Sequence, residues 1–385
     1  MLKHFNFKFK YYNWRLLFLV LALTCIGIVV IGSAVPGAGY QSKQIIGLIG
    51  SIFVMVLVSV INYNSLLKLH WLIYGACIVI LLLVLLVGKE VNGATRWIRI
   101  AEGIQLQPSE FAKIMMILFW SWLLGHNPDF LKKWKNLFIS FALTAVPLLL
   151  IVAEPDLSTT ILTTSIFIVS LFVAGLSYKK IGILIAIIVP IAIGLVIYIQ
   201  TPNQKLLKPY QLKRILSYIN PDEYDDLRYQ QDNSVLAIGS GQLNGKGLYN
   251  DSADSVKNGN YLLEPQTDFI FAIVGEELGF VGSVTILVML MLIATECVIC
   301  GTRAPNLSGR LICFGVASIV VFQSFINVGV ATELLPNTGI PLVFVSYGLS
   351  SLVSIYAGIG LVLNVGINRK IALEGKNNEY RVNRT

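Results

Sequence analysis

The chain has 385 residues, of which 55% are hydrophobic and only 13% are charged. A composition this apolar excludes an ordinary soluble domain and predicts an integral membrane protein. The formal net charge of +8 is spread around the apolar segments, which argues against a nucleic-acid-binding face.

Ten apolar stretches recur along the sequence, each about long enough to cross the roughly 30 Å of bilayer hydrocarbon. They are residues 14–34, 44–61, 71–88, 108–126, 136–153, 158–175, 181–200, 269–299, 310–332 and 342–366. Because backbone polar groups in lipid must be satisfied internally, these stretches predict an all-α integral membrane fold of about ten transmembrane helices. We expect a single polytopic membrane domain over 1–385, with one large extracellular loop, 201–268, between the seventh and eighth helices.

Lysine and arginine are divided unevenly between the two sides of this predicted bundle. With the N-terminus inside, the inner segments carry Lys3, Lys8, Lys10, Arg15, Lys68, Lys132, Lys133, Lys135, Lys179, Lys180, Arg303, Arg310, Arg369, Lys370, Lys376, Arg381 and Arg384. The short outer loops carry only Lys43, Lys89, Arg96 and Arg99. This bias predicts that both termini are cytoplasmic, and that the basic tail, 369–385, contacts lipid head groups. Most acidic residues fall outside or within spans, so we expect carboxylate chemistry to face outward.

The outer connection over about 89–107, which contains Arg96, leads into a clear helix start. Pro108 at the first helical position and Glu110 two residues later are both typical of a helix N-terminus. Glu110 and Lys113 are three residues apart and share one helix face. Three interpretations of Lys113 stay open: it snorkels to the surface, it pairs with Glu110, or it binds a phosphate.

Another outer turn, 153–159, contains Glu154, Pro155 and Asp156. In one interpretation Asp156 or Ser158 caps the next helix. In the other, Glu154 and Asp156 are a carboxylate pair that lines an outer cavity.

The large outer loop, 201–268, contains Arg214 and ends in a glycine-punctuated segment, 237–248, that includes Lys246. Its aromatic and apolar residues predict that it packs, in the form of amphipathic helices on the outer leaflet. The glycines of 237–248 can bring backbone N–H groups close to an anion, or they can simply form turns.

The most informative stretch is 264–279, where a polar loop ends and a long apolar helix begins. Asp268 lies at this boundary, either as the helix N-cap or as a general base. Glu276 and Glu277 lie about two turns deeper, where an ionisable side chain is costly and marks a functional cavity. Adjacent helical residues point about 100° apart, so at most one of the two shares the face of Asp268.

Histidines cannot serve an outward site, because His4, His70 and His126 all fall on the predicted inner side. This excludes a Ser-His-Asp triad and a histidine-ligated zinc there, and it leaves carboxylates as the general bases. Cys297 and Cys300 end a helix on the inner side, with no second pair to complete a metal site. Outward carboxylates with scattered Arg and Lys point to a substrate with a lipid tail and an anionic head, whose phosphate or pyrophosphate basic residues would hold.

At these residues the chain resembles the shape, elongation, division and sporulation (SEDS) family, the RodA/FtsW/SpoVE-type membrane proteins. The similarity covers nearly the whole chain, and its blocks follow the family's order. The blocks are 93–98, 107–113, 154–157, 214–221, 229–230, 237–241, 245–247, 267–279 and 327–348. The chain departs from the family pattern at Gln266, where a histidine is frequent, and at Glu333 and Leu349.

The resemblance implies a peptidoglycan glycosyltransferase that polymerises lipid II at the outer face of the bacterial cytoplasmic membrane. It implies a class B penicillin-binding protein as the partner, and a match between Asp268 and the family's essential aspartate. A divalent cation, Mg or Mn, is a candidate cofactor near Asp268 or Glu110. Beside Asp268 as the catalytic residue, the expected substrate-binding residues are Arg96, Glu110, Lys113, Glu154, Asp156, Arg214, Lys246, Glu276, Glu277 and Ser346.

Two rival functions stay open on the sequence. A lipid II flippase needs the same head-group cavity without a general base. Glu276 and Glu277, which lie within a span, are consistent with this alternative. A scaffold for a transpeptidase would leave the buried charges unexplained.

Overall fold

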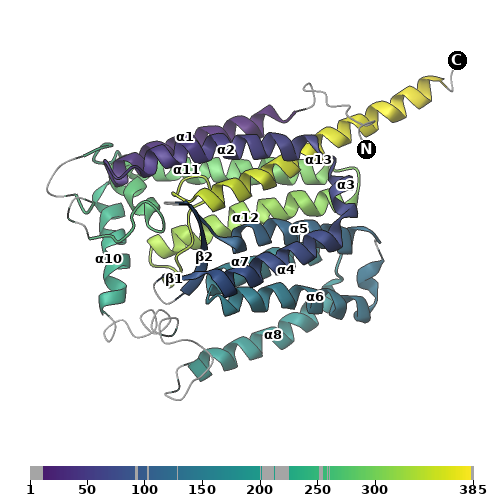
Figure 1. Ribbon diagram of the computed structural model, residues 1–385, viewed down its shortest axis with the longest axis horizontal. Coiled ribbons are helices and arrows are strands. Elements are labelled where there is room, and N and C mark those ends of the chain that lie inside the picture. The colour runs from purple at the N-terminus through teal and green to yellow at the C-terminus, as the bar shows by residue number, and fades with distance from the viewer. Residues whose placement is uncertain are drawn as a thin grey trace.

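A computed structural model of the chain describes residues 12–382 except 92–93, 102–103, 128, 200, 202–211, 213–224, 251–254, 258 and 260. Long helices lie side by side in a bundle, with α10 and the strands at one end and both termini at the other (Figure 1). The helices are α1 Trp14–Ala34, α2 Tyr40–Val60, α3 Tyr63–Lys68, α4 His70–Val87, α5 Pro108–Gly125, α6 Trp134–Ala153, α7 Leu157–Val173, α8 Tyr178–Ile199, α10 Asp225–Ser240, α11 Ile270–Thr302, α12 Leu307–Ala331 and α13 Leu349–Val382, with a 3-10 turn at Phe130–Lys132.

A helix occupies each of the ten predicted apolar stretches. Among the described residues, seven helical segments are long and apolar enough to cross a membrane: α1, α2, α4, α6, α11, α12 and the Leu349–Arg369 part of α13. Helix α7 is shorter, with 17 residues. The mostly helical membrane fold is confirmed, and the count of ten crossings stays a prediction.

Burial separates a central from a peripheral layer of helices. In α12 and in Leu349–Arg369, 67% and 78% of the apolar window is buried, whereas α2 and α4 bury only 22% each. The exposed side chains of α2 and α4 are mainly large and apolar, such as Phe53 and Leu86. Exposed apolar side chains are expected where a helix faces lipid, so α12 and the first half of α13 form the core around which the other helices pack.

The predicted tenth stretch, 342–366, differs from the observed helix at both ends. Residues 332–348 form an irregular connection between α12 and α13, in which Glu333, Gly339 and Phe344 have positive φ angles of 61°, 72° and 65°. Helix α13 then begins at Leu349 and runs on to Val382, through most of the predicted tail. The apolar residues Leu342, Val343, Phe344 and Val345 are buried in the connection rather than in a helix.

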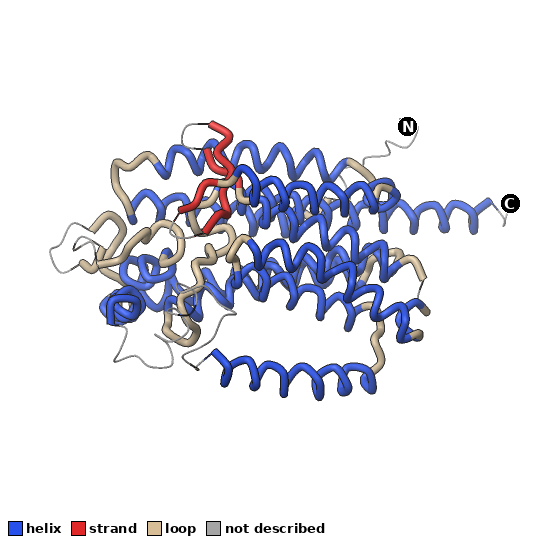
Figure 2. The backbone as a smooth tube through the Cα atoms, turned by 60° about the horizontal axis from the view of Figure 1, so that its bottom comes forward, coloured by secondary structure: helices blue, strands red, loops and turns tan. Residues whose placement is uncertain are grey.

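A small sheet was not predicted from the sequence. Strands β1 Lys89–Val91, β2 Ala94–Ala101 and β3 Ile104–Leu106 form an antiparallel sheet in the order β1-β2-β3. The strands stand out from the helical bundle near the loops at one end (Figure 2). The signal for β2 is its β-branched and aromatic content, with Thr95, Trp97, Ile98 and Ile100. The sheet places Arg96 beside the turn between the end of α6 and the start of α7.

Candidate active site

Helix α11 starts near α10, at the end of the bundle opposite the termini (Figure 1), and the half-buried Asp268 lies two residues before this start. The main chain around it is held by three hydrogen bonds from later parts of the sequence. The N–H of Tyr347 donates to the carbonyl of Gln266 at 2.8 Å. The hydroxyl of Ser346 donates to the carbonyl of Thr267 at 2.7 Å, and the amide of Asn327 donates to the carbonyl of Asp268 at 2.8 Å. These bonds fix the position of the backbone that carries Asp268.

The sequence left open whether Asp268 caps the following helix. Helix α11 begins at Ile270, with Phe269 in the N-cap position and no side-chain capping bond. Asp268 therefore lies one residue before the cap, at the boundary itself. Ser346, predicted to bind substrate, donates to the chain next to Asp268 and accepts a bond from the N–H of Leu342 at 2.7 Å.

Helix α12 connects the Asp268 segment to a buried ion pair. Asn327 also donates to the carbonyl of Ile340 at 2.8 Å, and Gln323, one turn earlier, donates to the carbonyl of Pro341 at 3.1 Å. The side-chain oxygen of Gln323 accepts a hydrogen bond from Lys113 at 2.8 Å. Two amides on one face of α12 thus join the Asp268 backbone, the connection 332–348 and Lys113.

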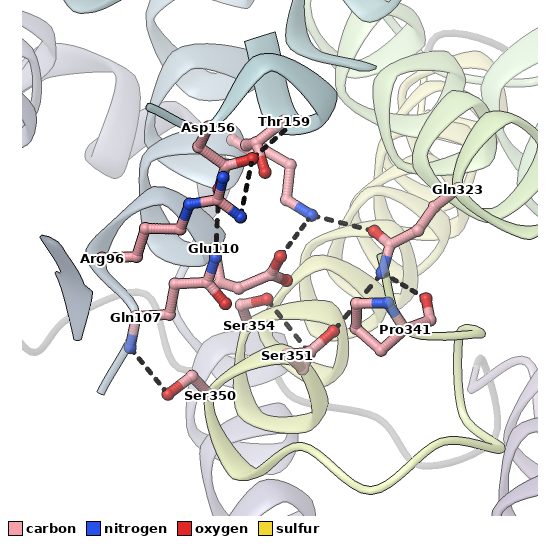
Figure 3. A network of polar contacts seen from close by, with 11 residues as sticks. Arg96, Gln107, Glu110, Asp156, Thr159, Gln323, Pro341, Ser350, Ser351 and Ser354 are labelled. Atoms are coloured by element: carbon pink, nitrogen blue, oxygen red, sulfur yellow. Dashed lines mark hydrogen bonds and ion pairs between the residues drawn. The ribbon is translucent and has the colours of Figure 1, made fainter. Parts of the chain in front are cut away.

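Lys113 forms an ion pair with Glu110 at 2.9 Å, in the network shown in Figure 3. Relative exposures of 1% for Lys113 and 3% for Glu110 show that neither side chain reaches the surface. Snorkelling by Lys113 is therefore wrong, and pairing with Glu110 is what the structure shows. Burying a charged side chain is costly unless it is paired and hydrogen-bonded, and this pair satisfies both conditions.

A second charged group contains Arg96 and Asp156 (Figure 3). Asp156 is the N-cap of α7 and accepts from the N–H of Thr159 at 3.1 Å, so the capping interpretation is confirmed. Its carboxylate also accepts from Gln107 at 3.2 Å and lies 3.9 Å from the guanidinium of Arg96. Arg96 donates to the carbonyl of Pro155. Asp156 therefore both starts a helix and holds the arginine on β2 in place.

Glu154 is fully buried beside this group, and neither carboxylate oxygen has a hydrogen-bond partner among the described residues. Burial, and then the neighbouring charge of Asp156, raise the pKa of Glu154 from 4.5 to about 9, against an opposing effect of Arg96. At neutral pH Glu154 therefore keeps its proton.

The raised pKa of Glu154 predicts a pH-dependent stability. The folded state retains a proton that the unfolded chain releases above pH 4.5, so this residue makes the protein less stable as the pH rises from there to about 9. Glu154→Gln cannot ionise, and its stability advantage over wild type should grow with pH, to the order of 3 kcal/mol at pH 7. Thermal unfolding from about pH 5 to about pH 8 checks this. Parallel profiles for the two proteins would contradict it.

Glu276 and Glu277, predicted to contact substrate, are each bound by a lysine of the preceding loop. The Glu276 carboxylate pairs with Lys246 at 2.8 Å and accepts from the N–H of Val256 at 2.8 Å. The Glu277 carboxylate pairs with Lys257 at 2.7 Å and accepts from Ser33 at 2.6 Å. These bonds attach the loop to α11 and, through Ser33, to α1.

Helix α11 is interrupted at Gly279, which has φ 67° and ψ −163°. The glycine-punctuated loop fills this interruption, and its N–H groups donate to the helix. The N–H groups of Lys246 and Gly247 bond to the carbonyls of Glu276 and Glu277 at 2.9 and 3.0 Å. In the opposite direction, the N–H of Phe280 on the helix donates to the carbonyl of Gln242 in the loop at 2.8 Å. In this structure the loop therefore completes a broken helix, and its backbone donors at these positions have protein partners.

Two glycines of this loop provide a matched pair of substitutions. Gly245 and Gly247 both have positive φ, at 77° and 90°, but an added Cβ would lie 2.2 Å from the carbonyl oxygen of Glu277 at Gly245 and meets nothing within 4 Å at Gly247. Gly247→Ala should cost only the backbone penalty, about 1 kcal/mol. Gly245→Ala should cost about 3 kcal/mol or more, because a backbone clash adds to it. Thermal unfolding of the two variants measures the difference, and equal losses would show that the loop yields at Gly245.

The structure thus joins most predicted residues into two groups at one end of the bundle: Arg96, Glu110, Lys113, Glu154 and Asp156 in one, and Lys246, Glu276 and Glu277 in the other. Arg214 lies outside the described residues. The sequence analysis did not identify Gln107, Gln323 and Lys257. Neutral amide side chains and a lysine in a loop carry no local signal, because their importance depends on what they contact.

Comparison with known proteins identifies relatives over almost the whole chain. Residues 14–371 match a family model described as "Cell cycle protein". The probable peptidoglycan glycosyltransferase FtsW of Acinetobacter baylyi is 34% identical, over 91% of this chain and 88% of its own length. Stage V sporulation protein E of Bacillus subtilis is 36% identical, over 83% of this chain and 84% of its own length.

Two solved structures have the same fold. A chain of a peptidoglycan synthase complex, studied for its coordination of polymerization and crosslinking, superposes with a TM-score of 0.77 at 31% identity, covering 93% of this chain and 98% of that one. The rod shape determining protein RodA of Thermus thermophilus gives a TM-score of 0.68 at 30% identity, covering 93% and 97%. With its family match, sequence relatives and fold in agreement, this chain belongs to the FtsW/RodA/SpoVE family of cell cycle proteins.

Proposed function

We propose that this protein, a peptidoglycan glycosyltransferase and multi-pass membrane protein, polymerises lipid II with Asp268 as the general base. The enzyme class rests on the family and its curated relatives. The role of Asp268 is supported by one observation above all: three hydrogen bonds to consecutive carbonyls hold its main chain beside a buried polar network. An active site needs its reacting groups held in such a fixed position.

In the proposed reaction, the Asp268 carboxylate accepts the proton of the 4-hydroxyl of the acceptor sugar. The hydroxyl oxygen attacks the anomeric carbon of the lipid-linked donor, and the bond from that carbon to the pyrophosphate oxygen breaks. One displacement inverts an α-linked donor into a β-linked product. No covalent intermediate on the enzyme is required.

The departing pyrophosphate needs positive charge close to it. Among the predicted basic residues, the side chains of Arg96, Lys246 and Lys113 each lie beside a carboxylate, but those of Arg96 and Lys246 are 16% and 20% exposed, whereas that of Lys113 is only 1% exposed. We assign Arg96 and Lys246 to the pyrophosphate and Lys113 to positioning. Arg214 stays a candidate from the sequence.

A divalent cation has no protein cage in the part of the chain that the structure describes. No three His, Cys, Asp or Glu side chains gather there as a metal site requires, and Glu110 is bound to Lys113. The carboxylates of the described residues therefore do not form a binding site for a resident metal ion. The cation is proposed only as a companion of the substrate pyrophosphate, and no step is assigned to it.

The proposed surroundings follow from the charge distribution. The excess of Lys and Arg on the predicted inner segments supports cytoplasmic termini, with Asp268 at the outer face of the bacterial cytoplasmic membrane. Similarity to a chain of a synthase complex that coordinates polymerization and crosslinking supports a crosslinking partner, for which we propose a class B penicillin-binding protein. The flippase alternative has lost its main support, because Glu276 and Glu277 are bound to loop lysines.

The experiment that tests this function supplies lipid II to the purified full-length protein, with and without a cognate class B partner. Long glycan strands on a gel from wild type, and none from Asp268→Ala, are expected. Well-folded wild-type protein that binds lipid II but makes no strands with any partner would contradict the proposal and favour transport or scaffolding.

A further inference from the structure

A cavity of about 450 Å³ lies at the end of the bundle that carries the termini, far from Asp268. The start of α1, the end of α11 and the second half of α13 form its wall, with Arg15, Arg303 and Arg369 among the lining residues. Asp268 precedes the start of α11, and Arg303 follows the other end of this 33-residue helix. The cavity is therefore a second site, separate from the polymerisation chemistry.

The cavity concentrates positive charge. Its three arginines face one acidic residue, Glu296, whose carboxylate accepts a hydrogen bond from Asn13 at 3.0 Å. Within the described ranges of the chain, Arg15, Arg303 and Arg369 form no ion pair. Guanidinium groups bind phosphate oxygens in a bidentate manner, so the charge of this cavity suits a phosphate-bearing anion.

An apolar track leads away from the cavity along α1. Trp14 lines the cavity and is 46% exposed, and Phe18, one turn further into the helix, is 66% exposed. Their ring centroids are 6.4 Å apart, so the two rings form a continuous exposed surface on one face of α1. Tryptophan is typical of the level where lipid head groups meet hydrocarbon, and an apolar track below it suits acyl chains.

We propose that this cavity binds the head group of an anionic phospholipid of the leaflet next to the termini. Arg15, Arg303 and Arg369 hold the phosphate, and the acyl chains lie along Trp14 and Phe18. Basic pockets between transmembrane helices are a known kind of phospholipid site. A soluble phosphate compound would use the arginines but would gain nothing from the exposed rings.

Native mass spectrometry of the full-length protein in detergent, titrated with phosphatidylglycerol or phosphatidylcholine, tests this proposal. Wild type should bind phosphatidylglycerol more tightly, because phosphatidylcholine carries no net charge. The double variant Arg303→Gln/Arg369→Gln should lose about tenfold in phosphatidylglycerol affinity. Arg310→Gln is the matched control, since Arg310 is exposed near the same end of the bundle and does not line the cavity; its affinity should stay unchanged.

A variant with the opposite effect keeps the test decisive if the double variant fails to fold. Glu296→Gln removes the one negative charge and should bind phosphatidylglycerol a few times more tightly. Wild-type affinity in Glu296→Gln, or in a double variant that folds, would overturn the proposal. Displacement of the lipid by millimolar inorganic phosphate would also overturn it, in favour of a soluble anion.

Discussion

Asp268→Asn is expected to abolish glycan polymerisation while the protein stays folded. The amide is nearly the same size as the carboxylate, but it cannot accept the proton of the attacking hydroxyl. Loss of a general base costs about 10²- to 10⁴-fold in rate. Three hydrogen bonds that fix this segment run to the carbonyls of Gln266, Thr267 and Asp268, and the substitution leaves these main-chain acceptors in place. Strand synthesis from lipid II, measured beside thermal unfolding, separates activity from folding.

Glu264→Gln is the matched control for this prediction. Glu264 is an exposed carboxylate four residues before Asp268, so the same chemical change is made in the same segment. Its polymerisation rate should stay close to wild type. Near-normal strand synthesis by Asp268→Asn would rule out the general-base role, and equal losses in both variants would point to the charge of the segment rather than to one base.

Lys113→Met is expected to be the most destabilising single change at the site. It leaves the Glu110 carboxylate buried without its cation, and breaking a buried ion pair in this way costs about 3–5 kcal/mol. The double variant Glu110→Gln/Lys113→Met removes both charges and should recover most of this loss. Unfolding in detergent, followed by tryptophan fluorescence, gives the free energies.

A surface pair with the same spacing provides the control. Lys132 and Asp129 are also three residues apart and form an ion pair at 2.8 Å, but their side chains are 75% and 68% exposed. Lys132→Met should therefore cost less than about 1 kcal/mol. An equal decrease in the free energy of unfolding for Lys113→Met and Lys132→Met would show that burial of the Glu110–Lys113 pair does not make it more important for stability.

The helices could be predicted because a run of about twenty apolar residues is a local signal. The connection 332–348 could not be predicted, because Leu342 to Val345 are as apolar as a membrane span. What keeps this segment irregular is bonding to distant residues: Gln323 and Asn327 on α12 hold the carbonyls of Pro341 and Ile340. The sheet was missed for a related reason, since its short strands lie between long helical signals.

Site residues could be predicted where a charge stands in apolar sequence. Glu110, Lys113, Glu276 and Glu277 were found in this way, because an ionisable group in a membrane segment is costly without a purpose. The Glu110–Lys113 pair was among the predicted alternatives, because the two residues are three apart on one helix. The partners of Glu276 and Glu277 could not be assigned: the cation beside Glu277 is Lys257, twenty residues earlier in a loop. The identity of such a distant pair depends on tertiary folding, which sequence spacing does not reveal.

At the interruption of α11 at Gly279, the bonds to the loop constrain some loop positions and leave others free to change. The loop contacts α11 there largely through main-chain N–H and carbonyl groups, and the side chain of Leu243 is exposed. Substitutions of Leu243 leave the main-chain bonds in place, whereas the left-handed backbone of Gln242, with φ 49°, restricts its replacement and Gly245 has no room for a Cβ. Homologues can therefore diverge at exposed loop positions, and acquire new surface contacts there, without altering the geometry of the helix beneath.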